Sequence, residues 1–484
     1  MTTVLTMMLF VCTICPGQDE EAVAEVLEGK RDTANAAWWG FNPDDSTDAI
    51  QSAIDSGAEN VIIPNLGKPW IVRPIFLRKS NQEVFFEEGV VIRAKKGEFK
   101  GGGDCLFSAK NAHNLVLRGY GATLEMRKVD YWGDDYQGGQ WRHGLSLRGC
   151  SNIEVLGLTI QNTGGDSLYI GRGPDEHITN DNIVIKDCVF HEPHRNGMLI
   201  ITAKNLLIEN CEFSNARGHS PMAGFSIEPN KPNEPIVDIH MRNCKIYGND
   251  CYGVHLYFYK VLAESEPVSI LLEGCHVSGG HIGLHVSTAK SGSAGGKVIM
   301  RDFTVENTIK SGIVCREIAA DSNIDFVFEN IRMDDVSTRK SFPPRVENIY
   351  RKYNSKRAPW HCRCHYPDHC SDTVPNATSL SKNWEGWYPY GPIVLWAKSA
   401  RRPLQGGIEF RNCTVTESKD IPVFVVAGTG STGQKAPPEF EGWTNISGNI
   451  KANNPNGVKV DRRVPLRNSN LTINGVLAEI AETQ

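Results

Sequence analysis

The feature that most constrains the fold is a short pattern that recurs along the chain every 23 to 33 residues. Each copy has six positions: an apolar residue, any residue, a small or polar residue, a residue that we call the filler, any residue and an apolar residue. In "IKDCVF" at 185–190, for example, the filler is Cys188. Self-similarity at this period indicates a stacked repeat array, and alternating apolar residues indicate strands. The copies lie at 155–160, 185–190, 208–213, 241–246, 272–277, 300–305, 328–333 and, after a long gap, 410–415.

A second strand pattern precedes each copy. Two or three strands per unit of this length match a right-handed parallel β-helix, in which each coil buries its apolar side chains by stacking on its neighbours. The sequence therefore predicts an all-β solenoid of this class. The second pattern is found at 143–147, 166–170, 196–200, 223–227, 252–256, 282–286 and 311–315.

The cysteines support this fold. The chain has 14 cysteines, and five of them occupy the same filler position of the repeat. One repeated position offers no partners for five separate disulfides, so we expect an interior ladder of free thiols that act as small hydrophobic groups. The five are Cys188, Cys211, Cys244, Cys275 and Cys413.

Residues 42–57, "NPDDSTDAIQSAIDSG", predict a short amphipathic helix that covers the open end of the first coil. Aspartates near its start favour the positive N-terminus, Ser46 or Thr47 can cap it, and Gly57 can end it. Here the sequence resembles the pectin-lyase-like superfamily, whose members often open with such a helix. The resemblance covers roughly residues 38–430, the expected β-helix. The stretches that begin at Trp141 and His194 also look like a widespread group of bacterial β-helix proteins tied to polysaccharide breakdown.

The N-terminus has an apolar stretch about as long as a signal-peptide core, although no Lys or Arg precedes it. We expect residues 1–18 to be a signal peptide and the protein to be secreted or periplasmic; a misassigned start or an apolar strand is the alternative. No later run reaches the roughly 18 apolar residues of a membrane span. A net charge of −5 gives no indication of nucleic-acid binding.

The repeat stops over residues 337–392, which we expect to form a long inserted loop region that projects from one face and serves binding. The insert contains a basic stretch (339–357), a Cys/His cluster (361–370) and an aromatic stretch (383–390). The spacing in the cluster does not match a standard zinc finger, so disulfides and a metal site both stay open and no zinc is predicted. Residues 431–484 are expected to finish and cap the last coils.

Alignment of the second strand pattern gives three columns of outward-facing residues. They concentrate His, Tyr, Arg and single carboxylates over about five coils, a composition that solvent exposure alone does not require. We therefore expect a functional cleft on this face. The columns are His143, Asp166, Asn196, Ala223, Tyr252, Ile282, Ser311; Ser146, Tyr169, Leu199, Ser226, His255, His285, Val314; and Arg148, Gly171, Ile201, Glu228, Tyr257, Ser287, Arg316.

Glycosidic hydrolysis usually needs two carboxylates. Asp166 and Glu228 are two coils apart, which separates them by about 9.6 Å along the solenoid axis. They also lie at opposite ends of their strands, which adds about 16 Å along the strand direction. The sequence therefore predicts that they do not act as one pair. Glu228 is expected to work with Asp175.

Asp166 is expected to work instead with Arg195, Asn196 and Tyr252. "GGDSLYI" also resembles the Gly-Asp-Asp strand of polygalacturonases, with Asp166 matching the first of the paired aspartates. Ser167 stands at the second, and the Gly-His-Gly element of that family is not found. The departures put polygalacturonase chemistry in doubt, though not hydrolysis in general.

Further candidates surround these carboxylates. His219 and His255 are candidate proton carriers, because imidazole titrates near neutrality. Arg148 and Arg316 share the column of Glu228 and can keep it ionised or bind a substrate carboxylate or sulfate. The last two are Asn230, beyond the same strand, and Trp141, whose loop (131–141) offers aromatic rings for stacking on sugars or, alternatively, as buried anchors.

Three functions are compatible with this face. The first is a secreted glycoside hydrolase acting on a complex, anionic polysaccharide, without cofactor or metal. The second is a polysaccharide lyase or uronate epimerase, in which Tyr252, His255 and Lys260 with Arg195 would serve. That chemistry can use Ca²⁺, but the strands show no cluster of aspartates suited to calcium. The third is a non-catalytic binder or adhesin. The sequence leaves the oligomeric state open.

Overall fold

The computed structural model describes residues 18–288, 292–318, 322–337, 391–397, 404–428, 443–454, 459–462 and 466–478. Almost all of the expected signal peptide, the insert between residues 338 and 390, and the Cys/His cluster at 361–370 therefore lie outside the described residues.

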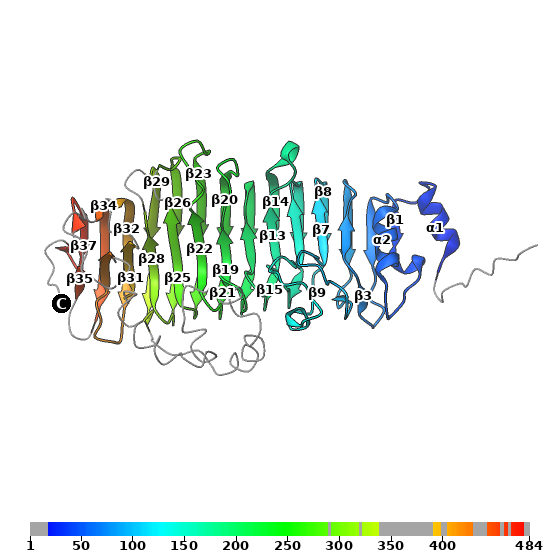
Figure 1. Ribbon diagram of the computed structural model, residues 1–484, viewed down its shortest axis with the longest axis horizontal. Helices are drawn as coiled ribbons and strands as arrows, with labels where there is room; N and C mark the ends of the chain where they lie inside the picture. The colour runs from blue at the N-terminus through cyan, green and yellow to red at the C-terminus, as the bar shows by residue number, and fades with distance from the viewer. Residues whose placement is uncertain are drawn as a thin grey trace, which may run out of the picture.

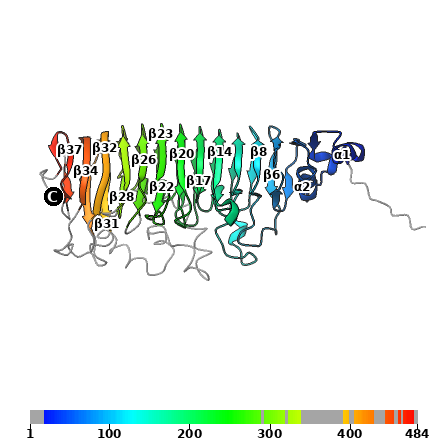
Figure 2. The same ribbon diagram turned by 90° about the horizontal axis from the view of Figure 1, so that it is seen from above.

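Stacked strands form a solenoid that runs along the long axis of the molecule (Figures 1 and 2). The strands of neighbouring coils pair in parallel, in one sheet of 26 strands and one of 12 within the described ranges. The predicted right-handed parallel β-helix is confirmed.

The 12-stranded sheet consists of β4 (Ile75–Leu77), β7 (Phe107–Lys110), β10 (Leu145–Arg148), β13 (Leu168–Gly171), β16 (Met198–Ile200), β19 (Ala223–Ile227), β22 (Tyr252–Phe258), β25 (Ile282–Thr288), β28 (Ser311–Arg316), β31 (Ile393–Ala397), β33 (Phe424–Gly428) and β35 (Val460–Arg462).

The 26-stranded sheet consists of β1 (Thr33–Asn35), β2 (Asn60–Ile63), β3 (Trp70–Val72), β5 (Gln82–Phe86), β6 (Val91–Ala94), β8 (His113–Arg118), β9 (Thr123–Glu125), β11 (Ser151–Leu156), β12 (Thr159–Gln161), β14 (Asn180–Lys186), β15 (Val189–His191), β17 (Ala203–Glu209), β18 (Glu212–Ser214), β20 (Ile236–Arg242), β21 (Lys245–Tyr247), β23 (Val268–Glu273), β24 (His276–Ser278), β26 (Gly296–Arg301), β27 (Thr304–Glu306), β29 (Ile324–Glu329), β30 (Arg332–Asp334), β32 (Leu404–Thr416), β34 (Trp443–Asn453), β36 (Leu466–Arg467), β37 (Asn470–Ile473) and β38 (Val476–Leu477).

One central coil shows how the sequence repeat makes its strands. β13 lies in the 12-stranded sheet, and β14 and β15 follow it in the other sheet. The filler Cys188 lies buried in the turn between β14 and β15. The repeated pattern is therefore the end of one strand, a turn and the start of the next, so that three strands make one coil.

The cysteine ladder is confirmed. All five filler cysteines are buried and free, and each Sγ donates to the carbonyl oxygen two residues earlier in the chain. The same local geometry therefore repeats in each of these coils. Contact between neighbouring thiols and burial raise the pKa of Cys244, which keeps this thiol protonated.

The predicted N-terminal helix is confirmed as α2 (Thr47–Asp55). Its cap differs from the expected Ser46 or Thr47, because the Ser46 hydroxyl donates to the Asn42 carbonyl at 2.6 Å. The Asp45 carboxylate instead accepts from the N–H of Thr47, the first residue of the helix, at 3.1 Å. Gly57 has a φ of +90°, as a helix end of this kind requires. A second helix, α1 (Glu20–Leu27), precedes it and was not predicted. Three short 3-10 helices are η1 (Ala36–Trp39), η2 (Asp130–Trp132) and η3 (Asp175–His177).

The coils continue beyond residue 430. β34 pairs in parallel with β32, and β37 pairs in parallel with β34. The described C-terminal strands thus extend the same sheet, and the antiparallel pair of β37 and β38 follows at its end.

Candidate functional site

The strand register confirms the predicted middle column. Ser146 pairs with Tyr169, Leu199, Ser226, His255, His285 and Val314 in succession, from β10 to β28. The candidate residues of neighbouring coils therefore stand side by side on the outer face of the 12-stranded sheet.

Asp166 lies buried in the turn before β13. Its Oδ1 accepts from the Asn196 backbone N–H at 3.0 Å and from Asn196 Nδ2 at 2.8 Å. Its Oδ2 lies 3.3 Å from His143 Nδ1. Burial alone would raise the pKa of Asp166, but Arg195, His143 and Asn196 outweigh burial and hold this pKa below its usual value. Asp166 is thus a buried anion whose partners are all protein groups.

Arg195 joins the two candidate carboxylates. Its Nη1 lies 3.5 Å from Asp166 Oδ1, and its Nη2 donates to Glu228 Oε2 at 2.6 Å. Asp166 and Glu228 were expected to have separate partners, but the Arg195 side chain contacts both carboxylates. Tyr252 was expected beside Asp166; its ring instead packs on His255 at 4.6 Å and on His285 at 5.0 Å.

Glu228 follows the last residue of β19, and 19% of its side chain is exposed. Its Oε1 lies 3.9 Å from His255 Nδ1, which in turn lies 3.0 Å from the Ser226 hydroxyl. The rings of His285 and Tyr257 stack on His255 at 5.1 and 5.6 Å. A half-buried carboxylate therefore borders a stack of imidazole and phenol rings.

Asp175 does not join Glu228. Its side chain is 90% exposed, in η3, and it pairs with Arg172 at 3.0 Å. The loop after β13 points this carboxylate into solvent, whereas Glu228 is held by Arg195. Asn230 is exposed, and its backbone N–H donates to Glu234 Oε2 at 2.5 Å, within the turn that follows Glu228.

The remaining candidates occupy the borders of the face. His219 Nδ1 lies 2.8 Å from the Ser220 carbonyl oxygen, and its ring is 6.3 Å from that of His194. Arg148 lies over the Tyr169 ring at 4.6 Å. Arg316 lies over the Trp396 ring at 4.7 Å and 3.6 Å from Glu317, so a carboxylate of the protein already neighbours this cation.

The aromatic loop at 131–141 contains both buried anchors and one exposed ring. Tyr131 and Tyr136 are buried, and the Tyr136 hydroxyl accepts from the Gly97 N–H at 3.2 Å. Trp132 Nε1 donates to His194 Nδ1 at 3.2 Å. Trp141 is 53% exposed, so its ring is accessible at the border of the face.

Sequence reasoning missed a buried charge cluster beside this face. Burial raises the pKa of Asp250 to about 7, although Arg217, 3.1 Å away, opposes the rise. Burial also lowers the pKa of Lys128 to about 8, against the opposing effect of Glu192 at 4.0 Å. These residues come from separate coils, and no local sequence signal links them.

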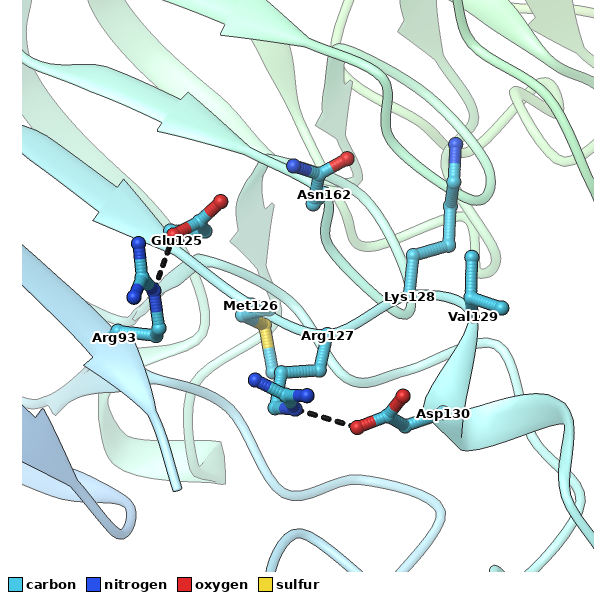
Figure 3. A pocket seen from close by; sticks show the side chains of 8 residues that line it. All are labelled: Arg93, Glu125, Met126, Arg127, Lys128, Val129, Asp130 and Asn162. Atoms are coloured by element: carbon cyan, nitrogen blue, oxygen red, sulfur yellow. Dashed lines mark hydrogen bonds and ion pairs between the residues drawn. The ribbon is translucent and has the colours of Figure 1, made fainter. Parts of the chain in front are cut away.

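A separate pocket of about 370 Å³ lies where β6 and β9 end (Figure 3). Its cations are largely neutralised within the pocket, since Arg93 pairs with Glu125 at 2.6 Å and Arg127 with Asp130 at 2.5 Å. It is lined by Arg93, Glu125, Met126, Arg127, Lys128, Val129, Asp130 and Asn162.

Within the described ranges, no group of three or more His, Cys, Asp or Glu residues is arranged to hold a metal ion. No described helix is long and apolar enough to cross a membrane.

Comparison with known proteins identifies the fold. Residues 115–331 match the family model described as right handed beta helix region. The exopolygalacturonase of family 28 from Yersinia enterocolitica superposes with a TM-score of 0.52 at 14% identity, over 92% of this chain and 78% of that one. The Streptococcus pneumoniae surface adhesin PfbA superposes with a TM-score of 0.51 at 11% identity, over 91% of each chain. The predicted right-handed parallel β-helix is confirmed, and these likenesses establish the fold alone.

A sequence relative is the uncharacterized protein YclG of Bacillus subtilis. It is 26% identical over 148 residues, which are 28% of this chain and 24% of that protein. The match thus spans about a quarter of the relative.

Proposed function

We propose that the protein is an enzyme that acts on polysaccharides, and that it is a glycoside hydrolase with Glu228 at its reacting centre. One observation carries the proposal. The Glu228 carboxylate is partly exposed and held by Arg195 at 2.6 Å, on a face whose neighbouring strands present Arg, Tyr and His side chains. A fixed carboxylate on a face of hydrogen-bond donors and rings suits binding and reaction of a sugar chain.

In this proposal Glu228 is the general base. The Arg195 guanidinium neutralises its charge and orients Oε2 by a charge-assisted hydrogen bond. Glu228 takes a proton from a water molecule as the water oxygen bonds to the anomeric carbon. The glycosidic C–O bond breaks, and a second water molecule on the opposite side of the sugar ring protonates the leaving oxygen. His255, 3.9 Å from Glu228, lies on the side of the base and positions that carboxylate. Asp166 is buried and holds Arg195, so it does not touch the substrate.

A polysaccharide lyase or uronate epimerase is the second candidate. The observation that favours it is the position of His255 and Tyr257 beside a single partly exposed carboxylate, with Arg195 between the acids. In this chemistry a base removes the proton next to a uronate carboxylate whose charge a cation neutralises. Only this alternative would call for Ca²⁺; the hydrolase needs no cofactor.

Two further parts of the proposal rest on the sequence. The apolar N-terminus supports export, and the arginines of the outer face support an anionic substrate, uronic or sulfated.

The test follows reducing ends and the ultraviolet absorbance of unsaturated uronates together, on uronic and sulfated polysaccharides. Glu228→Gln is expected to lower kcat/KM by roughly 10²- to 10⁴-fold, because it removes a general base. Glu154→Gln, at an exposed glutamate of β11 in the other sheet, is the matched control and should keep full activity. Reducing ends without absorbance indicate hydrolysis, and both signals together indicate a lyase. Full activity of Glu228→Gln would contradict the assignment.

A further inference from the structure

Two cations stand next to each other at the ends of neighbouring strands on the candidate face. Arg148 ends β10 and is in register with Lys110, which ends β7. Arg148 Nε donates to the Ser146 hydroxyl at 3.2 Å, and its guanidinium lies over the Tyr169 ring at 4.6 Å. In the described part of the chain, no carboxylate lies within ion-pair distance of either cation. The guanidinium is thus fixed by its Nε and its flat face, and Arg148 remains partly exposed.

The Tyr169 ring beneath Arg148 is itself held in place by its neighbours. The Tyr169 ring stacks on the His143 ring at 4.4 Å with an interplanar angle of 4°. A Cβ added at Gly171 would lie 1.9 Å from Tyr169 Cε1, so Tyr169 occupies space that only glycine leaves open. Gly171 is in register with Arg148, and the Tyr169 ring fills the space that the missing side chain leaves beside the guanidinium. The cation is therefore held in one place before any ligand binds.

This pair of cations lies at a definite place relative to Glu228. Arg148 pairs with Gly171, and Glu228 directly follows Ile227, which is in register with Ile200 and Ile170. Arg148 is therefore three strands, or about 14 Å, from Glu228 along the solenoid axis. Arg316 lies three strands away on the other side, but Glu317 neighbours it at 3.6 Å. A carboxylate of the protein therefore already neighbours Arg316, whereas in the described part of the chain none lies within ion-pair distance of Arg148.

We propose that Arg148 and Lys110 form a subsite for an oxyanion substituent, a carboxylate or a sulfate, on a sugar ring about 14 Å from the ring that reacts at Glu228. The inference rests on the proposed function and specifies its substrate as an anionic chain several rings long. A planar guanidinium binds two oxygens of such a group at once, and the lysine adds charge.

The test is calorimetric binding of a hexagalacturonate, a sulfated hexasaccharide and neutral cellohexaose to the Glu228→Gln protein, which binds without turnover. Adding Arg148→Gln is expected to weaken binding of at least one anionic hexasaccharide on the order of tenfold. The affinity of Arg148→Lys should lie between those of Arg148→Gln and its parent, because lysine keeps the positive charge but loses the planar guanidinium that can bind two oxygens at once. Lys245→Gln, at an exposed lysine of β21 in the other sheet, is the matched control and should bind as its parent does. The anionic ligand that responds identifies the substituent.

Unchanged binding in Arg148→Gln, or binding of cellohexaose with neither anionic ligand bound, would overturn the inference. A folding defect is separated from a binding defect by Tyr169→Phe, which keeps the ring beneath Arg148 and should retain affinity. If Arg148→Gln weakens anion binding while Glu228→Gln turns over at the wild-type rate in its own assay, the subsite stands and the proposed reacting centre falls.

Discussion

Asp166 and Glu228 contact the same guanidinium but differ in burial. Asp166 is completely buried, and Asn196, His143 and Arg195 surround its carboxylate. Glu228 keeps about a fifth of its side chain exposed. A buried carboxylate that contacts only protein groups positions other residues, whereas a partly exposed one can reach a substrate. The structure therefore gives the two acids different tasks, although both were candidates for catalysis.

The difference leads to a prediction about stability. Asp166→Asn is expected to lower the free energy of unfolding by about 3 kcal/mol, because it removes one partner of a buried ion pair. Glu228→Gln should cost less than about 1 kcal/mol, since its carboxylate is partly solvated. Urea denaturation of the two variants beside the wild type measures both values. Equal losses would show that burial does not separate their roles.

At the scale of the element, the turn between two strands of a coil carries the cysteine ladder. Each thiol lies in the core and donates to the carbonyl oxygen two residues before it. A small, weakly polar side chain suits this place because it fills the interior of the turn and still satisfies a carbonyl oxygen.

Cys211, Cys244 and Cys275 are therefore expected to resist alkylation in the native protein, because they are buried and because burial and the neighbouring thiols raise their pKa. Iodoacetamide followed by peptide mass spectrometry should find them unmodified, and fully modified in urea. Native modification at a rate close to that in urea would contradict the ladder.

The whole molecule is a stack in which each coil contacts mainly its two neighbours, and its stability is therefore distributed along one axis. Central coils have a neighbour on both sides. At the N-terminal end, α1 and α2 lie beside the first coil, whereas the described C-terminal end has the short strands β36, β37 and β38 (Figure 1).

Hydrogen exchange should follow this arrangement. Amides of β17 and β20 are expected to exchange at least tenfold more slowly than those of β37, because local opening costs less at the end of a stack. Exchange measured by mass spectrometry on peptides from these strands tests the prediction. Uniform protection from β17 to β37 would instead indicate one cooperative unit.

The repeat in the sequence was enough to predict the solenoid, the columns on its outer face, the cysteine ladder and helix α2. These features depend on local periodicity: a period of two places side chains on alternate faces, and a repeat of about one coil places like residues in register. The Ser146 column, for example, follows the repeat from β10 to β28.

Only the tertiary structure decided the relation of Asp166, Arg195 and Glu228. Strand spacing fixes where backbones lie, but Arg195 has a long side chain, and its direction depends on the turns around it. Periodicity likewise could not show that Asp175 is solvated, or that Tyr169 occupies the space left by Gly171. Backbone register follows from the repeat, whereas charge pairing between coils depends on side-chain reach and burial, which no local pattern records.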